Sequence, residues 1–117
     1  MDIKRVENIY KQHRVSSLPP KKLILWMVEE AHKALEVGKE AMVRKDISEQ
    51  NRHLQITQQL VLEIIPLVNS SNEMGRNLTA VLDFINRRLI EANMKSDVHI
   101  VEEIESLILD LKSLLTG

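Results

Sequence analysis

Cysteine is absent from the 117-residue sequence. The chain therefore has no disulfide framework, no thiol nucleophile and no cysteine ligands for a metal. Long apolar runs are also missing, so no segment is expected to insert into a membrane. The first residues, "MDIKRVENIYKQHR", contain no apolar signal core. These absences predict a cytoplasmic protein.

Glycine, proline and aromatic residues are scarce. There are three glycines, three prolines, one tryptophan, one tyrosine and one phenylalanine. Strands favour aromatic residues and loops favour glycine and proline, so this composition predicts long helices joined by short turns. An excess of one charge is missing as well, because 16 basic residues face 17 acidic ones. Nucleic-acid binding usually needs a basic excess or patch, so no nucleic-acid partner is predicted.

Apolar residues at helical spacing are abundant. They predict four long helices at about residues 21–44, 47–68, 73–92 and 97–115. A shorter helical segment, residues 3–12, precedes the proline break "SSLPP". Because short turns join antiparallel neighbours, the predicted fold is all-α: an antiparallel up-down four-helix bundle with a short N-terminal helical segment. We expect one domain, 1–117, with a mobile N-terminal segment and proline turn at 1–20 and the bundle at 21–115.

Capping residues mark the ends of these helices. Asp46 with Glu49 forms a capping pattern, and either Ser71 or Asn72 precedes the next helix. Ser96 or Asp97 can cap the last helix, and Asn93 suits a left-handed helix end. Gly38 lies in the middle of a helix, at a cost of about 1 kcal/mol relative to alanine. We therefore expect another helix to pack closely there.

Several apolar side chains lie off the core stripes of their helices. On a helical wheel Ile56, Leu60 and Leu67 share a second face, and Phe84 points about 120° from the centre of its stripe. Inner helices can also pack on two sides, so burial is the alternative for each of them. Exposed apolar patches usually mark an interaction surface, and we predict that these four residues line a groove for a partner. The short segment containing Tyr10 could occupy the same groove.

Sequence patterns for chemistry are weak. Glu29 and His32 form one Glu-x-x-His pattern, but a di-iron bundle needs two such copies. No phosphate-binding loop or nucleophile motif is present, so the sequence predicts no enzyme, no catalytic residue, no metal and no cofactor. Two alternatives stay open: a histidine phosphotransfer-like signalling bundle using His32, and a plain homo-oligomerising bundle. Monomer and dimer are both compatible with the sequence.

Two stretches resemble the flagellar secretion chaperones of the FliS family. "IYKQHRVSSLPPKKLIL" is similar to the family's opening through Tyr10, Gln12, Val15, Pro20, Leu23 and Leu25. "DFINRRLIEAN" resembles the family's most specific segment, with Asp83, Phe84, Asn86, Arg87, Arg88, Leu89, Glu91, Ala92 and Asn93 matching. Residues 27–31, "MVEEA", depart from the family's usual Leu-Tyr-Asp-Gly-Ala, which indicates a somewhat divergent member.

The resemblance implies a function. Family members bind the disordered C-terminal segment of flagellin in the bacterial cytosol, prevent its premature polymerisation and deliver it to the flagellar export gate. The resemblance also implies that the segment containing Tyr10 covers part of the binding surface. Arg87, Arg88 and Glu91 are expected to join helices or face solvent, and Asn51 and Asn93 to form interhelical or capping hydrogen bonds.

Overall fold

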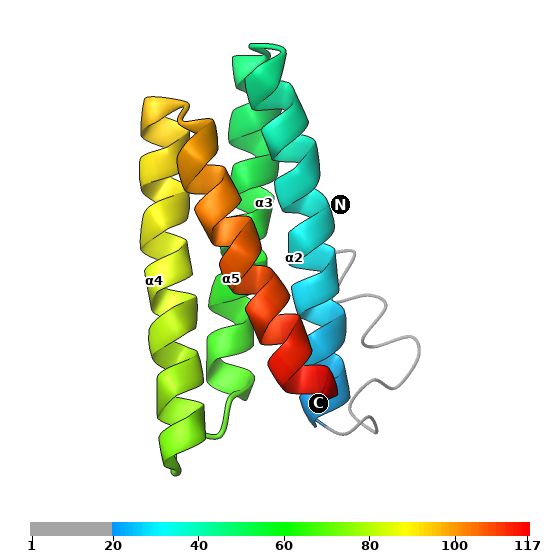
Figure 1. Cartoon of the computed structure of the whole chain (residues 1–117), viewed down its shortest axis with the longest axis vertical. Coiled ribbons are helices and arrows are strands. Elements are labelled where there is room, and N and C mark those ends of the chain that lie inside the picture. Colours follow the sequence, from blue (N-terminus) through cyan, green and yellow to red (C-terminus); the bar gives the residue numbers. More distant parts are fainter. Residues whose placement is uncertain (1–19) are drawn as a thin grey trace.

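The computed structural model describes residues 20–117, which form four helices and one short 3₁₀ turn (Figure 1). The helices are α2 (Pro20–Val43), α3 (Ile47–Ile64), α4 (Glu73–Lys95) and α5 (Val98–Thr116), and the turn η2 (Ile65–Leu67) follows α3. Successive helices run in opposite directions, so the predicted antiparallel up-down bundle is confirmed. The predicted N-terminal helical segment, with Tyr10, falls within residues 1–19 and so lies outside the described part of the chain.

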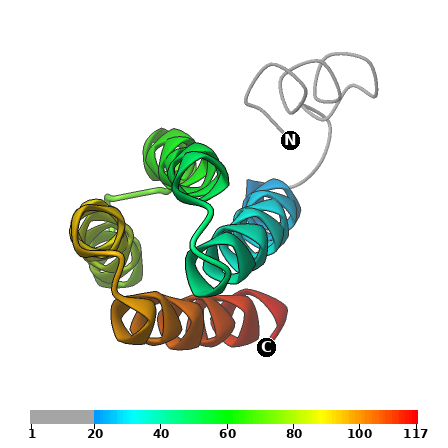
Figure 2. The same cartoon turned by 90° about the horizontal axis from the view of Figure 1, so that it is seen from above.

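Seen from one end, the four helices form a ring in which α5 lies across the side between α4 and α2 (Figure 2). The principal contacts are between α2 and α3, α3 and α4, α4 and α5, and α5 and α2. Each helix therefore has two helical neighbours. None of these four helices is both long and apolar enough to cross a membrane.

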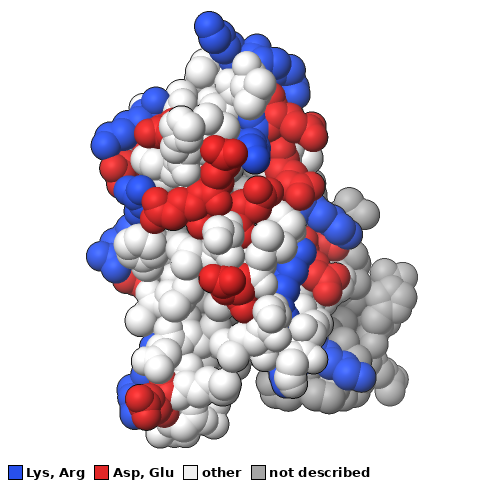
Figure 3. Space-filling view, viewed as in Figure 1, with Lys and Arg blue, Asp and Glu red and all other residues white. Residues whose placement is uncertain are grey.

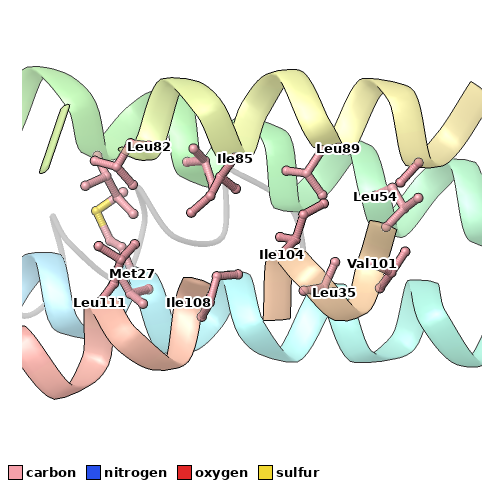
Figure 4. Close-up of a cluster of buried hydrophobic side chains, with 14 of the residues drawn as sticks. Met27, Leu35, Leu54, Leu82, Ile85, Leu89, Val101, Ile104, Ile108 and Leu111 are labelled. Carbon is pink, nitrogen blue, oxygen red and sulfur yellow. The ribbon is translucent and has the colours of Figure 1, made fainter. Parts of the chain in front are cut away.

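The central core is aliphatic, as the scarcity of aromatic residues requires. Leu35, Leu54, Ile85, Leu89 and Ile104 are all completely buried, and Figure 4 shows them meeting between the four helices. Apolar residues at helical spacing form a stripe along α4, and its later members Leu82, Ile85, Leu89 and Ala92 lie in this core. Leu78 and Val81, earlier in the same stripe, are only partly buried. The lower burial of these two residues marks the region where the helices of the bundle separate.

Gly38 allows α2 and α3 to approach closely. A Cβ atom at this position would lie 2.9 Å from Leu54 Cδ2 and 3.5 Å from His53 Cβ. The predicted packing role of this glycine is therefore confirmed.

Three of the helices begin as their capping residues predict. The side chain of Asp46 accepts a hydrogen bond from Glu49 N, Asn72 from Gly75 N, and Asp97 from His99 N. The prediction that Asn93 ends its helix is wrong. The left-handed residue is Ser96, at φ 49°, and α4 continues to Lys95. Pro66 lies where α3 ends: the α-helix stops at Ile64, and the chain continues as the 3₁₀ turn η2.

Candidate functional site

The predicted groove residues separate into two places. Ile56 and Leu60 are 7% and 1% exposed and form a small cluster with Ala31 and Ala34 of α2, against which Trp26 packs. These side chains are closed off, so the expectation that they lie on an open surface is wrong. The physical reason is the two-sided packing of α3, whose second face meets the small residues of α2. Tyr10 lies outside the described residues.

Leu67 and Phe84 are exposed, as the helical wheel predicted. Their exposed fractions are 38% and 40%. Leu67 is the last residue of η2 and lines a hollow at one end of the bundle. The other apolar residues that line this hollow include Ile24, Pro66, Met74, Leu78, Leu114 and Leu115. The hollow holds about 500 Å³.

This hollow continues between α4 and α5. Met74, Leu78 and Leu114 line both the first hollow and a second one, which adds Val81 and Leu111. Figure 1 shows the cause: α5 lies beside α4 at the upper end of the bundle and slants towards α2 at the lower end. We call the surface formed by Leu67, Met74, Leu78, Val81, Leu111 and Leu114 the α4–α5 groove.

Phe84 lies on α4 one turn beyond Val81, the last α4 residue that lines the α4–α5 groove. Residues three or four apart on a helix share a face, so Phe84 follows Asn77 and Val81 along α4. Asn77 and Val81 both line the groove. Leu67 thus lies at one end of the groove and Phe84 lies just beyond its other end on α4, whereas Ile56 and Leu60 belong to the α2–α3 cluster.

The groove is poor in charge. Figure 3 shows that the lower part of this face is mostly free of charged side chains, whereas acidic residues form a belt across its upper part. The charged residues that line the two hollows of the groove are Lys21 and Glu73. Such a surface suits apolar contacts and offers little for recognising an anion or a cation.

Met74 and Leu114 are groove residues that the sequence analysis missed. They are 61% and 46% exposed. Met74 lies in the first turn of α4, where the apolar periodicity is only beginning, and Leu114 stands next to the core residue Leu115. The available signal was that two consecutive leucines cannot both face one core, because neighbours on a helix point about 100° apart.

Polar side chains hold the opposite end of the bundle together. Gln50 is 1% exposed, and its Nε2 donates to the Asn93 carbonyl oxygen at 3.2 Å, Asn93 Oδ1 at 3.1 Å and Ser96 Oγ at 3.1 Å. Asn93 Nδ2 in turn donates to Asn51 Oδ1 at 2.7 Å. The interhelical hydrogen bond expected of Asn51 and Asn93 is confirmed, and it joins α3 to the last turns of α4.

An ion-pair network joins α4 to α5 near the same end. Arg88 donates to both carboxylate oxygens of Glu103, at 3.3 and 2.8 Å, and also to Glu91. Lys95 donates to the other oxygen of Glu91 at 2.7 Å. The hydrogen bond with Glu103 raises the pKa of Arg88, and those from Lys95 and Arg88 lower the pKa of Glu91. Arg88 joins helices as expected, whereas Arg87 pairs within α4 with Asp83.

His32 is enclosed by charged side chains of α2 and α5. Its side chain is 15% exposed, and Nε2 lies 3.2 Å from Glu36 Oε1 and 3.5 Å from Glu105 Oε2. A phosphoryl group on Nε2 would stand beside two carboxylates, which would repel it. This location argues against the phosphotransfer alternative.

These features define the class: a small antiparallel helical bundle, tied by polar groups at one end and with an apolar groove at the other. Comparison with known families gives a match to the model described as "Flagellar protein FliS" over residues 3–115. The chain therefore belongs to the FliS family.

Two relatives carry the same name, "Flagellar secretion chaperone FliS". The protein from Bacillus subtilis (strain 168) is 26% identical over 112 residues, which cover 96% of this chain and 84% of the relative. The protein from Escherichia coli (strain K12) is 45% identical over 38 residues, which cover 32% of this chain and 28% of the relative.

Proposed function

We propose that this protein is a flagellar export chaperone that binds the disordered C-terminal segment of flagellin in the bacterial cytosol. Binding would prevent premature polymerisation and present flagellin to the export gate, without catalysis or a cofactor. Membership of the FliS family and the name of the B. subtilis relative support this role. The observation in the structure that carries the proposal is the α4–α5 groove.

The groove suits one amphipathic helix of the client. The stretch of α4 from Met74 to Phe84, along the groove and just beyond it, corresponds to about 15 Å at the rise of an α-helix. A client helix of about three turns spans that length and presents apolar residues at i, i+3, i+4 and i+7. We propose that Leu67, Phe84, Met74 and Leu114 contact these residues.

A second contact region is proposed from the resemblance. Tyr10 and its neighbours would cover part of the client-binding surface until flagellin displaces them. Ile56 and Leu60 would not take part in this contact, because both are buried against Ala31 and Ala34 of α2. Ordering of the flagellin segment on binding costs free energy, which lowers the affinity and favours release at the export gate.

The test replaces exposed groove residues and leaves the core intact. Met74→Glu and Leu114→Glu each place a carboxylate on the apolar surface, and we expect each to weaken binding of a C-terminal flagellin peptide about ten- to hundredfold. Met94→Glu is the matched control, because Met94 is an 81% exposed methionine near the other end of α4. Isothermal titration calorimetry gives the affinities, and circular dichroism checks the fold.

If Met74→Glu, Leu114→Glu and Met94→Glu all bind the peptide with equal affinity, the groove is not part of the binding surface. If the unaltered chain ignores the peptide and light scattering shows a tight dimer, the chaperone proposal itself is wrong and the homo-oligomer alternative gains support.

A further inference from the structure

Three potential metal-binding groups converge between α2 and α5. His32 Nε2 lies 3.2 Å from Glu36 Oε1, on the next turn of α2, and 3.5 Å from Glu105 Oε2 on α5. All three atoms lie within 4.8 Å of one another. His32 Nε2 is shielded from solvent and forms no hydrogen bond of acceptable geometry in the described structure.

These separations match those between the ligands of one small cation. Zn²⁺ binds imidazole nitrogen and carboxylate oxygen at about 2.1 Å, and tetrahedral geometry then places two ligand atoms about 3.4 Å apart. The two distances from His32 Nε2 lie close to that value. Three protein ligands would leave a fourth position for water.

Two lysine side chains contact members of this cluster. Lys39 Nζ lies 3.6 Å from Glu105 Oε1, which leaves Oε2 directed at His32. Lys112 Nζ lies 2.6 Å from His32 Nδ1. An imidazole that binds metal through Nε2 carries its proton on Nδ1, so a metal ion and the Lys112 contact exclude each other.

We propose that His32, Glu36 and Glu105 form a Zn²⁺ site that links α2 to α5 and that opens when Lys112 moves away from His32. This inference does not depend on the proposed function, because the site uses none of the groove residues. The bound ion would hold the first described helix to the last one, and it would stabilise the bundle because the site exists only when the two helices are packed.

The experiment titrates the untagged full-length chain with ZnCl₂ by calorimetry. We expect one site, a rise in the thermal unfolding midpoint with Zn²⁺, and visible absorption bands of tetrahedral Co²⁺ when cobalt replaces zinc. His32→Gln and Glu105→Gln should each weaken binding at least about tenfold. Lys112→Met should tighten it, because the competing ammonium group is removed.

His53→Gln is the matched control. His53 is another half-buried histidine with a glutamate one turn away, Glu49, at 3.4 Å, and it is not one of the three clustered groups. This variant should bind Zn²⁺ like the unaltered chain. The proposal is overturned if neither the unaltered chain nor Lys112→Met binds Zn²⁺, or if His32→Gln and Glu105→Gln bind as tightly as His53→Gln.

Discussion

Gly75 lies where the turn after η2 folds against the first turn of α4. A Cβ atom there would be 1.7 Å from the carbonyl oxygen of Asn69 and 2.7 Å from its carbonyl carbon. Because backbone atoms cannot move aside as a side chain can, we expect Gly75→Ala to lower the free energy of unfolding by about 1–3 kcal/mol. Urea unfolding measures the change.

Gly38→Ala is the comparison for this prediction. Its new Cβ would meet Leu54 Cδ2 at 2.9 Å, and Leu54 can rotate. The gain in helix propensity, about 1 kcal/mol, also offsets part of the overlap. If Gly38→Ala lowers the free energy of unfolding as much as Gly75→Ala does, the distinction between backbone and side-chain contacts is wrong.

The lowered pKa of Glu91 makes a prediction about acid stability. Hydrogen bonds from Lys95 and then Arg88 favour its ionised form, so its pKa in the folded chain is below the ordinary value of 4.5. Its contribution to stability is therefore complete above pH 4.5 and is lost as the pH falls towards the folded-state pKa. We expect the stability difference between the unaltered chain and Glu91→Gln to shrink below pH 4.5, as followed by urea unfolding across pH. A difference that does not change with pH would refute this assignment.

At the scale of single residues, the solvent exposure of a side chain was the property hardest to predict from the sequence. A helical wheel gives the angle of Ile56 or Leu60 from one stripe, but it does not say how many neighbours the helix has. Because Ala31 and Ala34 leave room on α2, the second face of α3 is buried too. Phe84 and Leu67 were predicted to be exposed and are exposed.

At the scale of the helix, local chemistry determined most boundaries. Asp46, Asn72 and Asp97 cap their helices through side-chain hydrogen bonds to backbone N–H groups nearby in sequence, which a sequence pattern can identify. The structural role of Asn93 could not be predicted from such a local pattern. Its role depends on Gln50 and Asn51, more than 40 positions away, and only the folded chain brings them together.

The segment "DFINRRLIEAN" forms the C-terminal half of α4. It begins beside the groove at Phe84 and ends at the polar cluster around Asn93, with the Arg88–Glu103 pair between them. Most of its matched residues therefore have structural roles: Leu89 and Ala92 are core, and Arg88 and Asn93 join helices. The most recognisable part of the sequence thus identifies the fold of the family more directly than its binding surface.

At the scale of the whole molecule, the four-helix architecture followed from apolar spacing and short turns. The groove did not, because it arises from the slant of α5 relative to α4 (Figure 1), and no single helix encodes that angle. Leu111 belongs to the core and Leu78 packs against it, yet both also line the groove.

The shortage of charge in the groove has a consequence for solution conditions. Dissolved ions screen attractions between charged groups, but they weaken contacts between hydrocarbon surfaces very little. We expect the affinity for a flagellin C-terminal peptide to change less than about threefold between 50 and 500 mM NaCl, measured by fluorescence anisotropy. A drop of more than tenfold would mean that the acidic belt, and not the groove, attracts the client. If the affinity instead changes as little as expected, the protein would hold its client equally well in a dilute and in a salt-stressed cell.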